Sequence, residues 1–239
     1  MKPSAAKTKP QPKPKAGKKS RPPSKEELLS KPRLRQILQR LEKAYPDAKC
    51  ALTHADAFQL LVATILSAQC TDVRVNMVTP ELFRKYPTPA DFAALRQEVL
   101  EQEIHSTGFF RNKAKSIIGA AQKIVREFGG KVPDEMDAIL TLPGVARKTA
   151  NVVLGTAYGK ATGVVVDTHV QRIAQRLGLT SETAPEKIEK DLMGLIPKEK
   201  WIDFSHEVIF HGRQCCSARQ PNCPACPLED ICYSPDKRV

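Results

Sequence analysis

The stretch TLPGVARKTANVVLGTAYGKATGVVVD, residues 141–167, decides the fold of this chain. Its first part, LPGV at 142–145, predicts a tight turn, and the helix that follows carries Lys148 in its first turn. A return run then ends on Asp167. A lysine near a helix N-terminus and a carboxylate that arrives from elsewhere are the parts of an amine nucleophile and its electrostatic partner.

The turn at 142–145 joins two predicted helices. Gly144 allows a positive φ and the close approach of a phosphate, and the next helix presents unbonded backbone N–H groups to an anion. Contacts of this kind hold a nucleic acid backbone without reading its sequence. An ordinary corner between two helices is the more common explanation of such a turn, so its weight comes from the residues that follow.

Lys148 and Asp167 each have two interpretations. Most helix lysines are solvated and protonated, whereas a nucleophilic amine has to be partly desolvated or close to positive potential. The first turn of a helix supplies that potential, and Arg147 adds to it. Asp167 can cap the helix that starts at Thr168, or it can stabilise a developing positive charge and shuttle protons, and these two roles are compatible.

Composition and periodicity predict an all-α protein. The 239 residues suffice for one large domain or two small ones, and 41% are hydrophobic but only 5% aromatic. Apolar residues recur at helical spacing, and only the run at 164–166 suggests a strand. Helices are expected near 34–41, 58–68 with Asp56 as its cap, 113–128, 170–177, 185–194 and 199–211.

The net charge of +12 is concentrated at the N-terminus. Residues 1–25 hold nine Lys or Arg and no acidic residue, which leaves about +3 for the rest of the chain. This Lys/Pro-rich composition predicts a disordered arm. A basic arm indicates a polyanionic partner, because contacts with phosphates release counterions, although a tail that only improves solubility fits equally well.

No apolar run approaches the ~20 residues of a membrane span, and no apolar segment follows the basic N-terminus, so neither a membrane anchor nor a secretory signal is predicted. Seven cysteines, most of them near the C-terminus, form an odd set. This argues against a disulfide framework and for a metal site in the reducing cytoplasm.

Four cysteines follow the pattern C-x6-C-x2-C-x5-C within seventeen residues: Cys216, Cys223, Cys226 and Cys232. Intervening prolines keep the loops out of helix, so the thiols can converge on a metal. Zinc sites usually contain two C-x2-C pairs and only one is present, so the spacing favours an iron–sulfur cluster and leaves zinc open. Cys215 does not give the x6 gap, and Cys50 and Cys70 are expected to be small buried residues.

Four segments together resemble endonuclease III, a bifunctional DNA glycosylase of the helix-hairpin-helix superfamily. They are ILSAQCTD (65–72), LPGVARKTANVVL (142–154), VVVDTHV (164–170) and HGRQCCSARQPNCPACPLEDIC (211–232), and the resemblance covers residues 30–233. It implies two helical domains with a DNA-binding cleft between them: a six-helix barrel with the helix-hairpin-helix at 51–160, and a [4Fe–4S] cluster domain made of 26–50 and 161–239. It thereby favours iron over zinc.

The resemblance also implies an activity. The expected substrates are oxidised pyrimidines (thymine glycol, dihydrouracil, 5-hydroxycytosine) and abasic sites in duplex DNA. Lys148 would attack C1′ and form a Schiff base, Asp167 would stabilise the sugar cation, and β-elimination would cut the strand 3′ to the lesion. A monomer that works in the cytoplasm, at the nucleoid, is expected.

Further residues match the family's contacts with DNA. Gln69 would enter the gap left by the flipped nucleotide, and Phe109 would act as a wedge. The hairpin and the loop beside the cluster would hold phosphates, through Leu142, Gly144, Ala146, Arg147 and Arg219. Each has a plain structural alternative, such as a helix cap for Gln69 and core packing for Phe109.

One departure from the family is Ala146, where relatives usually carry glycine. If that position needs an unusual backbone angle, alanine costs about 1 kcal/mol there; if it needs only a small side chain, little changes. Adenine-mispair and mismatch glycosylases of the same fold lack the lysine, and 8-oxoguanine glycosylases lack the cluster. From another class, a noncatalytic DNA-binding or redox-sensing iron–sulfur module is the alternative.

Deleting residues 1–25 is expected to weaken nonspecific binding to duplex DNA and to flatten its salt dependence, because up to nine cationic side chains leave the complex. The measurement is the slope of log binding constant against log salt concentration for the full and the shortened chain. An unchanged slope would show that the arm does not contact DNA and would support the alternative that it only improves solubility.

Overall fold

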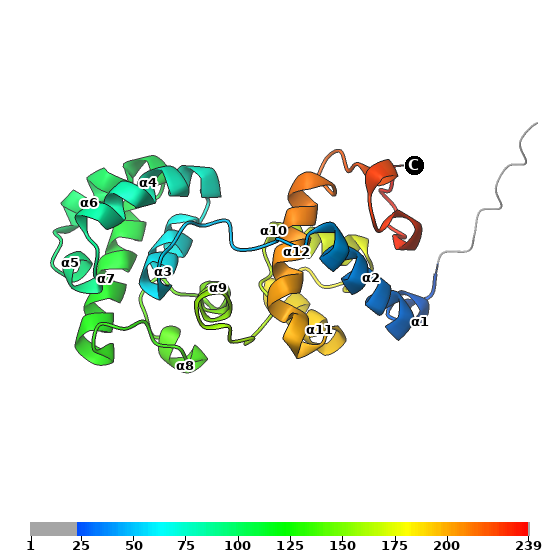
Figure 1. Ribbon diagram of the computed structural model, residues 1–239, viewed down its shortest axis with the longest axis horizontal. Helices are drawn as coiled ribbons and strands as arrows, with labels where there is room; N and C mark the ends of the chain where they lie inside the picture. The colour runs from blue at the N-terminus through cyan, green and yellow to red at the C-terminus, as the bar shows by residue number, and fades with distance from the viewer. Residues whose placement is uncertain (1–22, 239) are drawn as a thin grey trace, which may run out of the picture.

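The computed structural model describes residues 23–238, and no strand occurs in that range, which confirms the all-α class (Figure 1). The α-helices are α1 (Lys25–Leu28), α2 (Lys31–Ala44), α3 (Ala57–Leu66), α4 (Asp72–Lys85), α5 (Pro89–Ala93), α6 (Gln97–Ile104), α7 (Phe110–Phe128), α8 (Met136–Ile139), α9 (Arg147–Tyr158), α10 (Thr168–Arg176), α11 (Pro185–Leu195) and α12 (Trp201–Gln214). Short 3₁₀ helices are η1 (His105–Thr107), η2 (Lys198–Lys200), η3 (Cys223–Ala225) and η4 (Glu229–Ile231).

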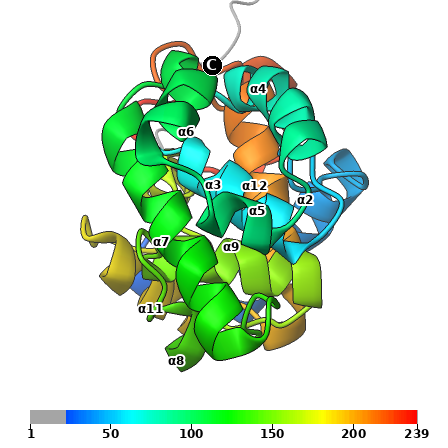
Figure 2. The ribbon, with the colours of Figure 1, turned by 90° about the vertical axis from the view of Figure 1, so that its left-hand side faces the viewer.

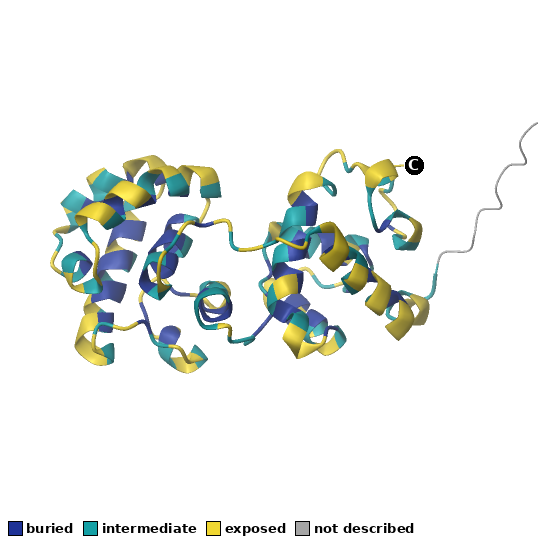
Figure 3. Cartoon of the chain, viewed as in Figure 1, coloured by how far each residue is buried: buried dark blue, intermediate teal, exposed yellow. Residues whose placement is uncertain are grey.

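The helices form two lobes, each around its own hydrophobic core (Figures 1 and 3). The first lobe contains α3 to α9, and the second contains α1, α2, α10 to α12 and the cysteine segment. Figure 2 looks onto the first lobe, with α7 in front and α12 of the second lobe behind it. The chain crosses between the lobes twice, at 45–56 and at 159–167.

Helix α3 is the most deeply buried element of the first lobe. Its sequence is almost wholly apolar, and it packs mainly against α9, with α4 and α7 beside it. Asp56 caps it as predicted, because its carboxylate accepts a hydrogen bond from the backbone N–H of Gln59 at 2.8 Å. A helix that is buried on most sides has to be apolar on most sides, and the sequence of α3 meets this requirement.

The second lobe joins the two ends of the described chain. Arg33 of α2 is only 7% exposed, and its guanidinium donates to the backbone carbonyls of Leu177 and Ile231 at 2.8 Å. A buried guanidinium is tolerated only when its donors are used, and here backbone carbonyls use them. This side chain therefore ties α2 to α10 and to the cysteine segment.

Two expectations about local structure are wrong. The run at 164–166 has no regular secondary structure, and the backbone N–H of Val165 donates to Ser205 Oγ at 3.1 Å instead of to a neighbouring strand. The disordered arm was predicted to extend to Lys25, but α1 already begins at that residue. Ser24 and Glu27 form the capping box that starts this helix. Residues 1–22, where the rest of the arm falls, lie outside the described residues.

Among residues 23–238, no helix is both long and apolar enough to span a membrane.

Candidate active site and cysteine pocket

A pocket between the two lobes is lined by both residues that the sequence singled out for chemistry. Lys148 belongs to α9 of the first lobe, and Asp167 belongs to the segment that leads into α10 of the second lobe. Residues 49–52, the end of α3, the start of α4 and side chains of α12 also line it. The arrangement therefore presents an amine and a carboxylate to one space from two separate parts of the chain.

Lys148 is the second residue of α9, as predicted, and its side chain is exposed at the pocket. Ala146 occupies the N-cap position and has no side-chain acceptor for the first N–H groups of the helix. These N–H groups and the positive end of the helix dipole are left for an anion from outside. The start of α9 thus combines an amine with a site suited to a phosphate.

Asp167 caps α10, which confirms one of its two interpretations. Its Oδ1 accepts hydrogen bonds from the backbone N–H groups of His169 and Val170, both at 2.8 Å. Its Oδ2 lies 2.9 Å from Nδ1 of His169, a partner that the sequence did not indicate. With both oxygens held, the carboxylate is a fixed negative charge at the edge of the pocket.

The hairpin before α9 explains why alanine is acceptable at position 146. Gly144 has φ of +76°, whereas Ala146 has φ of −93°, in the ordinary extended region. Ala146 therefore carries no backbone strain, and the departure from the family is harmless to the fold. Leu142 is 2% exposed, so its side chain belongs to the core and only its backbone can reach a ligand.

Gly144→Ala is expected to lower the free energy of unfolding by about 1–3 kcal/mol, because the positive φ strains any Cβ. A Cβ at this position would also lie 2.5 Å from Cβ of Ser116. Ala146→Gly is the matched control in the same turn and should change stability by less than about 0.5 kcal/mol. Urea unfolding of the two variants measures the difference, and equal losses would contradict this account of the turn.

A buried carboxylate fixes the helix that carries Lys148. Glu189 of α11 is 6% exposed and accepts hydrogen bonds from Arg147 Nε at 2.9 Å and from Asn151 Nδ2 at 2.8 Å. Thr162 Oγ1 then donates to Asn151 Oδ1 at 2.9 Å. A Cβ on Gly163 would lie 2.0 Å from a Glu189 oxygen, so any larger residue there would displace this hydrogen-bonded carboxylate. The network links α9, α11 and the segment that ends on Asp167.

An ion pair crosses the pocket from one lobe to the other. Arg213 of α12 donates to Asp72 of α4 at 2.6 Å. His206 lines the same pocket, and burial lowers its pKa, so this imidazole is neutral near pH 7. Neither the ion pair nor the Glu189 network was predicted, because nothing in the sequence links residues that are so far apart.

The two predicted DNA-entering residues occupy exposed loops with unusual backbone. Gln69 has φ of +52° and Phe109 has φ of +49°, and they are the two non-glycine residues of the described range with positive φ. Phe109 is 61% exposed, which excludes the alternative that it packs in the core. Arg219 is exposed in the loop between the first two cysteines of the predicted set.

A second pocket is lined by the four predicted ligand thiols, Cys216, Cys223, Cys226 and Cys232, and by Cys215. Hydrogen-bond donors surround several of the sulfurs. Arg176 Nη1 lies 3.1 Å from Cys216 Sγ. The backbone N–H of Leu228 lies 3.4 Å from Cys226 Sγ, and that of Arg238 lies 3.3 Å from Cys223 Sγ. Donors of this kind stabilise thiolate sulfur bound to metal.

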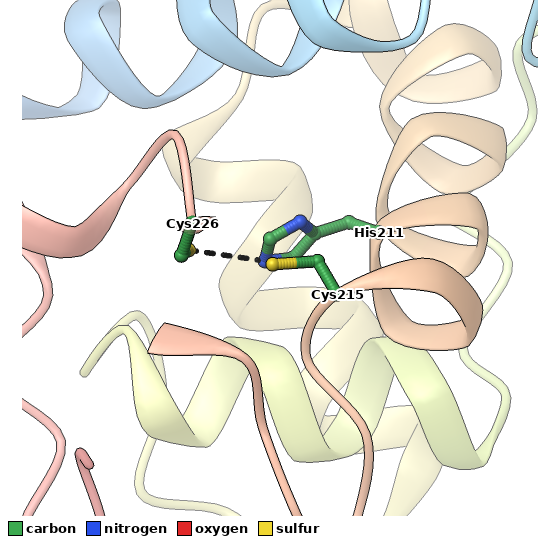
Figure 4. A group of neighbouring side chains, drawn as sticks. All are labelled: His211, Cys215 and Cys226. Carbon is green, nitrogen blue, oxygen red and sulfur yellow. Dashed lines mark hydrogen bonds between the residues drawn. The ribbon is translucent and has the colours of Figure 1, made fainter. Parts of the chain in front are cut away.

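The tightest group in this pocket is not the predicted set. Donor atoms of His211, Cys215 and Cys226 lie within 4.8 Å of one another (Figure 4). His211 is held by the hydroxyl of Tyr45, 2.9 Å from Nδ1, and burial lowers its pKa to about 4. Burial raises the pKa of Cys226 to about 12, so metal binding has to displace a proton from this thiol.

Comparison of the sequence with known protein families gives the same result as this architecture. A family model described as HhH-GPD superfamily base excision DNA repair protein matches residues 62–198. Endonuclease III of Synechocystis sp. is 58% identical over 204 residues, which cover 85% of this chain and 93% of that protein. This chain belongs to the endonuclease III family. Endonuclease III of Escherichia coli is 38% identical over 209 residues, covering 87% of this chain and 99% of that one.

Solved structures of the family have the same fold. A trapped endonuclease III–DNA covalent intermediate superposes with a TM-score of 0.81 at 46% identity, covering 85% of this chain and 95% of the other. A thermostable thymine-DNA glycosylase shares the fold at 22% identity, with a TM-score of 0.76. Family membership makes this chain a base excision repair enzyme, a DNA glycosylase with abasic-site lyase activity. The cysteine-rich pocket is consistent with an iron–sulfur cluster.

Proposed function

We propose that this enzyme removes oxidised pyrimidines, such as thymine glycol, dihydrouracil and 5-hydroxycytosine, from duplex DNA and then cuts the strand at the abasic site. The observation that supports this most is that Lys148 and Asp167 line one pocket between the lobes. A damaged base stacks poorly, so it can be flipped into that pocket at low cost. We expect the enzyme to work as a monomer in the cytoplasm, at the nucleoid.

In the proposed mechanism the neutral amine of Lys148 attacks C1′, and the base departs with the bonding electrons and takes up a proton. Opening of the sugar ring turns the adduct into a Schiff base. Loss of a C2′ proton then expels the 3′ phosphate, so the strand breaks 3′ to the lesion. The fixed carboxylate of Asp167 stabilises positive charge on the sugar while the base leaves.

The proposed DNA contacts fall into two groups. Gln69 and Phe109 enter the stack from exposed loops, which is supported by their exposure and their positive φ. Phosphates are held by the hairpin through Gly144, Ala146 and the start of α9, and by Arg219. Arg147 takes part with its Nε already paired to Glu189, so its main effect is to orient α9.

We propose that the two lobes are the two expected domains, 51–160 and 26–50 with 161–239. The separate cores support this division, because one draws on residues 52–154 and the other on residues 37–41 and 164–228. The second domain would hold a [4Fe–4S] cluster through Cys216, Cys223, Cys226 and Cys232. The donor set fits, since all four are free thiols on one pocket. When bound, the cluster supplies a rigid cross-link that shapes the loop carrying Arg219.

Cys216→Ser is expected to remove most of the bound iron and the visible iron–sulfur absorbance, whereas Cys215→Ser, a change of the adjacent thiol, should keep both. A serine oxygen is a poor replacement for a thiolate ligand of iron. Iron analysis and absorbance of the two purified proteins measure this. The reverse pattern would make Cys215 the ligand, and zinc in place of iron would refute the cluster.

The function is tested on a duplex that contains one thymine glycol, with borohydride present. With borohydride, a covalent protein–DNA adduct is expected. Without borohydride, a nick 3′ to the lesion is expected. Base release without an adduct would mark a glycosylase that does not use an amine. Binding with neither product would support the noncatalytic module instead.

A further inference from the structure

Lys113 of α7 is a buried lysine for which the mechanism has no use. It is 5% exposed, and its Nζ donates to the backbone carbonyls of Leu66 and Thr107, both at 2.8 Å. Within residues 23–238 no ion pair joins it to a carboxylate. Burial lowers the pKa of this amine, so the fold retains it against a desolvation cost.

The two carbonyls belong to the roots of the two loops that carry the proposed DNA-entering residues. Leu66 is the last residue of α3, and Gln69 follows three positions later. Thr107 ends η1, and Phe109 follows two positions later. One ammonium group thus bonds both loops where each leaves the helical framework.

Both loops need such support. Each carries a non-glycine residue in the left-handed region, Gln69 at φ +52° and Phe109 at φ +49°. Backbone of this kind is strained for a residue with a side chain and persists only where neighbouring groups hold it. At the C-terminus of α3 a cation is also favoured by the helix dipole and satisfies a carbonyl that the helix leaves unbonded.

We propose that Lys113 is a positioning residue that holds the Gln69 loop and the Phe109 loop at a fixed separation, so that both side chains enter the duplex as one rigid pair. The inference rests on the proposed roles of Gln69 and Phe109. Two loops that are already ordered and mutually fixed lose less conformational entropy on insertion. Lys113 then affects the reaction rate only indirectly, because it influences how readily the nucleotide flips out of the stack.

The test compares borohydride trapping at a preformed abasic site in duplex and in single-stranded DNA. Only the duplex has a stack to enter, so the ratio of the two trapping rates reports on the loops. Lys113→Met keeps an unbranched side chain and removes the donors; we expect the duplex rate to fall about tenfold to hundredfold, with the single-strand rate within about twofold. Lys113→Arg, which can donate to both carbonyls, should recover most of the ratio.

Tyr158→Phe is the matched control, because it removes a 2.6 Å hydrogen bond to Val132 O in the same lobe, and neither residue belongs to either loop. It should leave the ratio unchanged even if it lowers stability. Parallel losses on both substrates in Lys113→Met, or no loss, would overturn the inference. If Lys113→Met does not fold, hydrogen exchange of Lys113→Gln, whose shorter side chain cannot reach both carbonyls, replaces it: residues 67–71 and 107–110 have to change together, and no change or a change in one loop alone overturns the inference.

Gln69→Ala and Phe109→Ala separate this inference from the proposed function. If neither lowers the duplex-to-single-strand ratio, the proposed roles of the loops are wrong. If both lower it and Lys113→Met does not, the loops act as proposed and the coupling through Lys113 alone is wrong.

Discussion

Replacing Lys148 with alanine is expected to abolish the borohydride-trapped adduct and to lower strand cleavage at thymine glycol by at least ~10³-fold. Without the amine no Schiff base forms, and without the Schiff base the β-elimination has no electron acceptor. Trapping is followed by gel shift of a labelled duplex, and cleavage by the length of its product. Affinity for uncleaved duplex should change much less, because the hairpin and loops are intact.

Lys49 offers a matched control for that experiment. It lines the same pocket and is exposed, so it is another amine that could reach a sugar there. Lys49→Ala is expected to keep the adduct. An adduct that persists in Lys148→Ala and disappears in Lys49→Ala would identify Lys49 as the nucleophile. An adduct that persists in both variants would show that the nucleophile is another residue.

Asp167→Asn is expected to slow base release by about 10²–10³-fold with little loss of stability. The amide oxygen can still accept the two backbone N–H bonds that start α10, but the negative charge is gone. Asp167→Ala removes the cap as well and should lower the free energy of unfolding by a further ~0.5–2 kcal/mol. The two variants thus separate the charge of this residue from its structural role.

The readout for Asp167 is single-turnover kinetics on two substrates. Base release from a thymine glycol duplex creates positive charge on the sugar, whereas trapping at a preformed abasic site needs no base to leave. The loss should therefore be large on the first substrate and less than about tenfold on the second. Equal losses on both would assign Asp167 to binding or to the lyase step.

Local chemistry made much of this fold predictable. Asp56 and Asp167 precede apolar helical runs and both prove to be caps, since a carboxylate at that position bonds free N–H groups whatever surrounds it. The LPG turn likewise specified the start of α9. The run at 164–166 proves not to be a strand, because apolar β-branched residues suit a largely buried segment without regular structure as well as they suit a strand.

The pairing of distant residues could not be predicted. Asp72 and Arg213 are separated by 141 positions, and Lys113 bonds a carbonyl 47 positions away. Nothing in the local sequence distinguishes such side chains from solvated ones, because their partners are set by how the helices pack. The same applies to Glu189, which reads as an ordinary acidic residue of an amphipathic helix and proves to be buried.

The bond from Arg33 to Ile231, 198 residues further along, has a consequence for biosynthesis. Polypeptide synthesis proceeds at about 5–20 residues per second, so the backbone that α2 binds is made on the order of 10–40 s after α2 itself. The first lobe can fold on the ribosome during that interval, while Ile37 and Leu41 of α2 still lack their partners in the second core. The second lobe can therefore complete its core only after the first lobe has been synthesised.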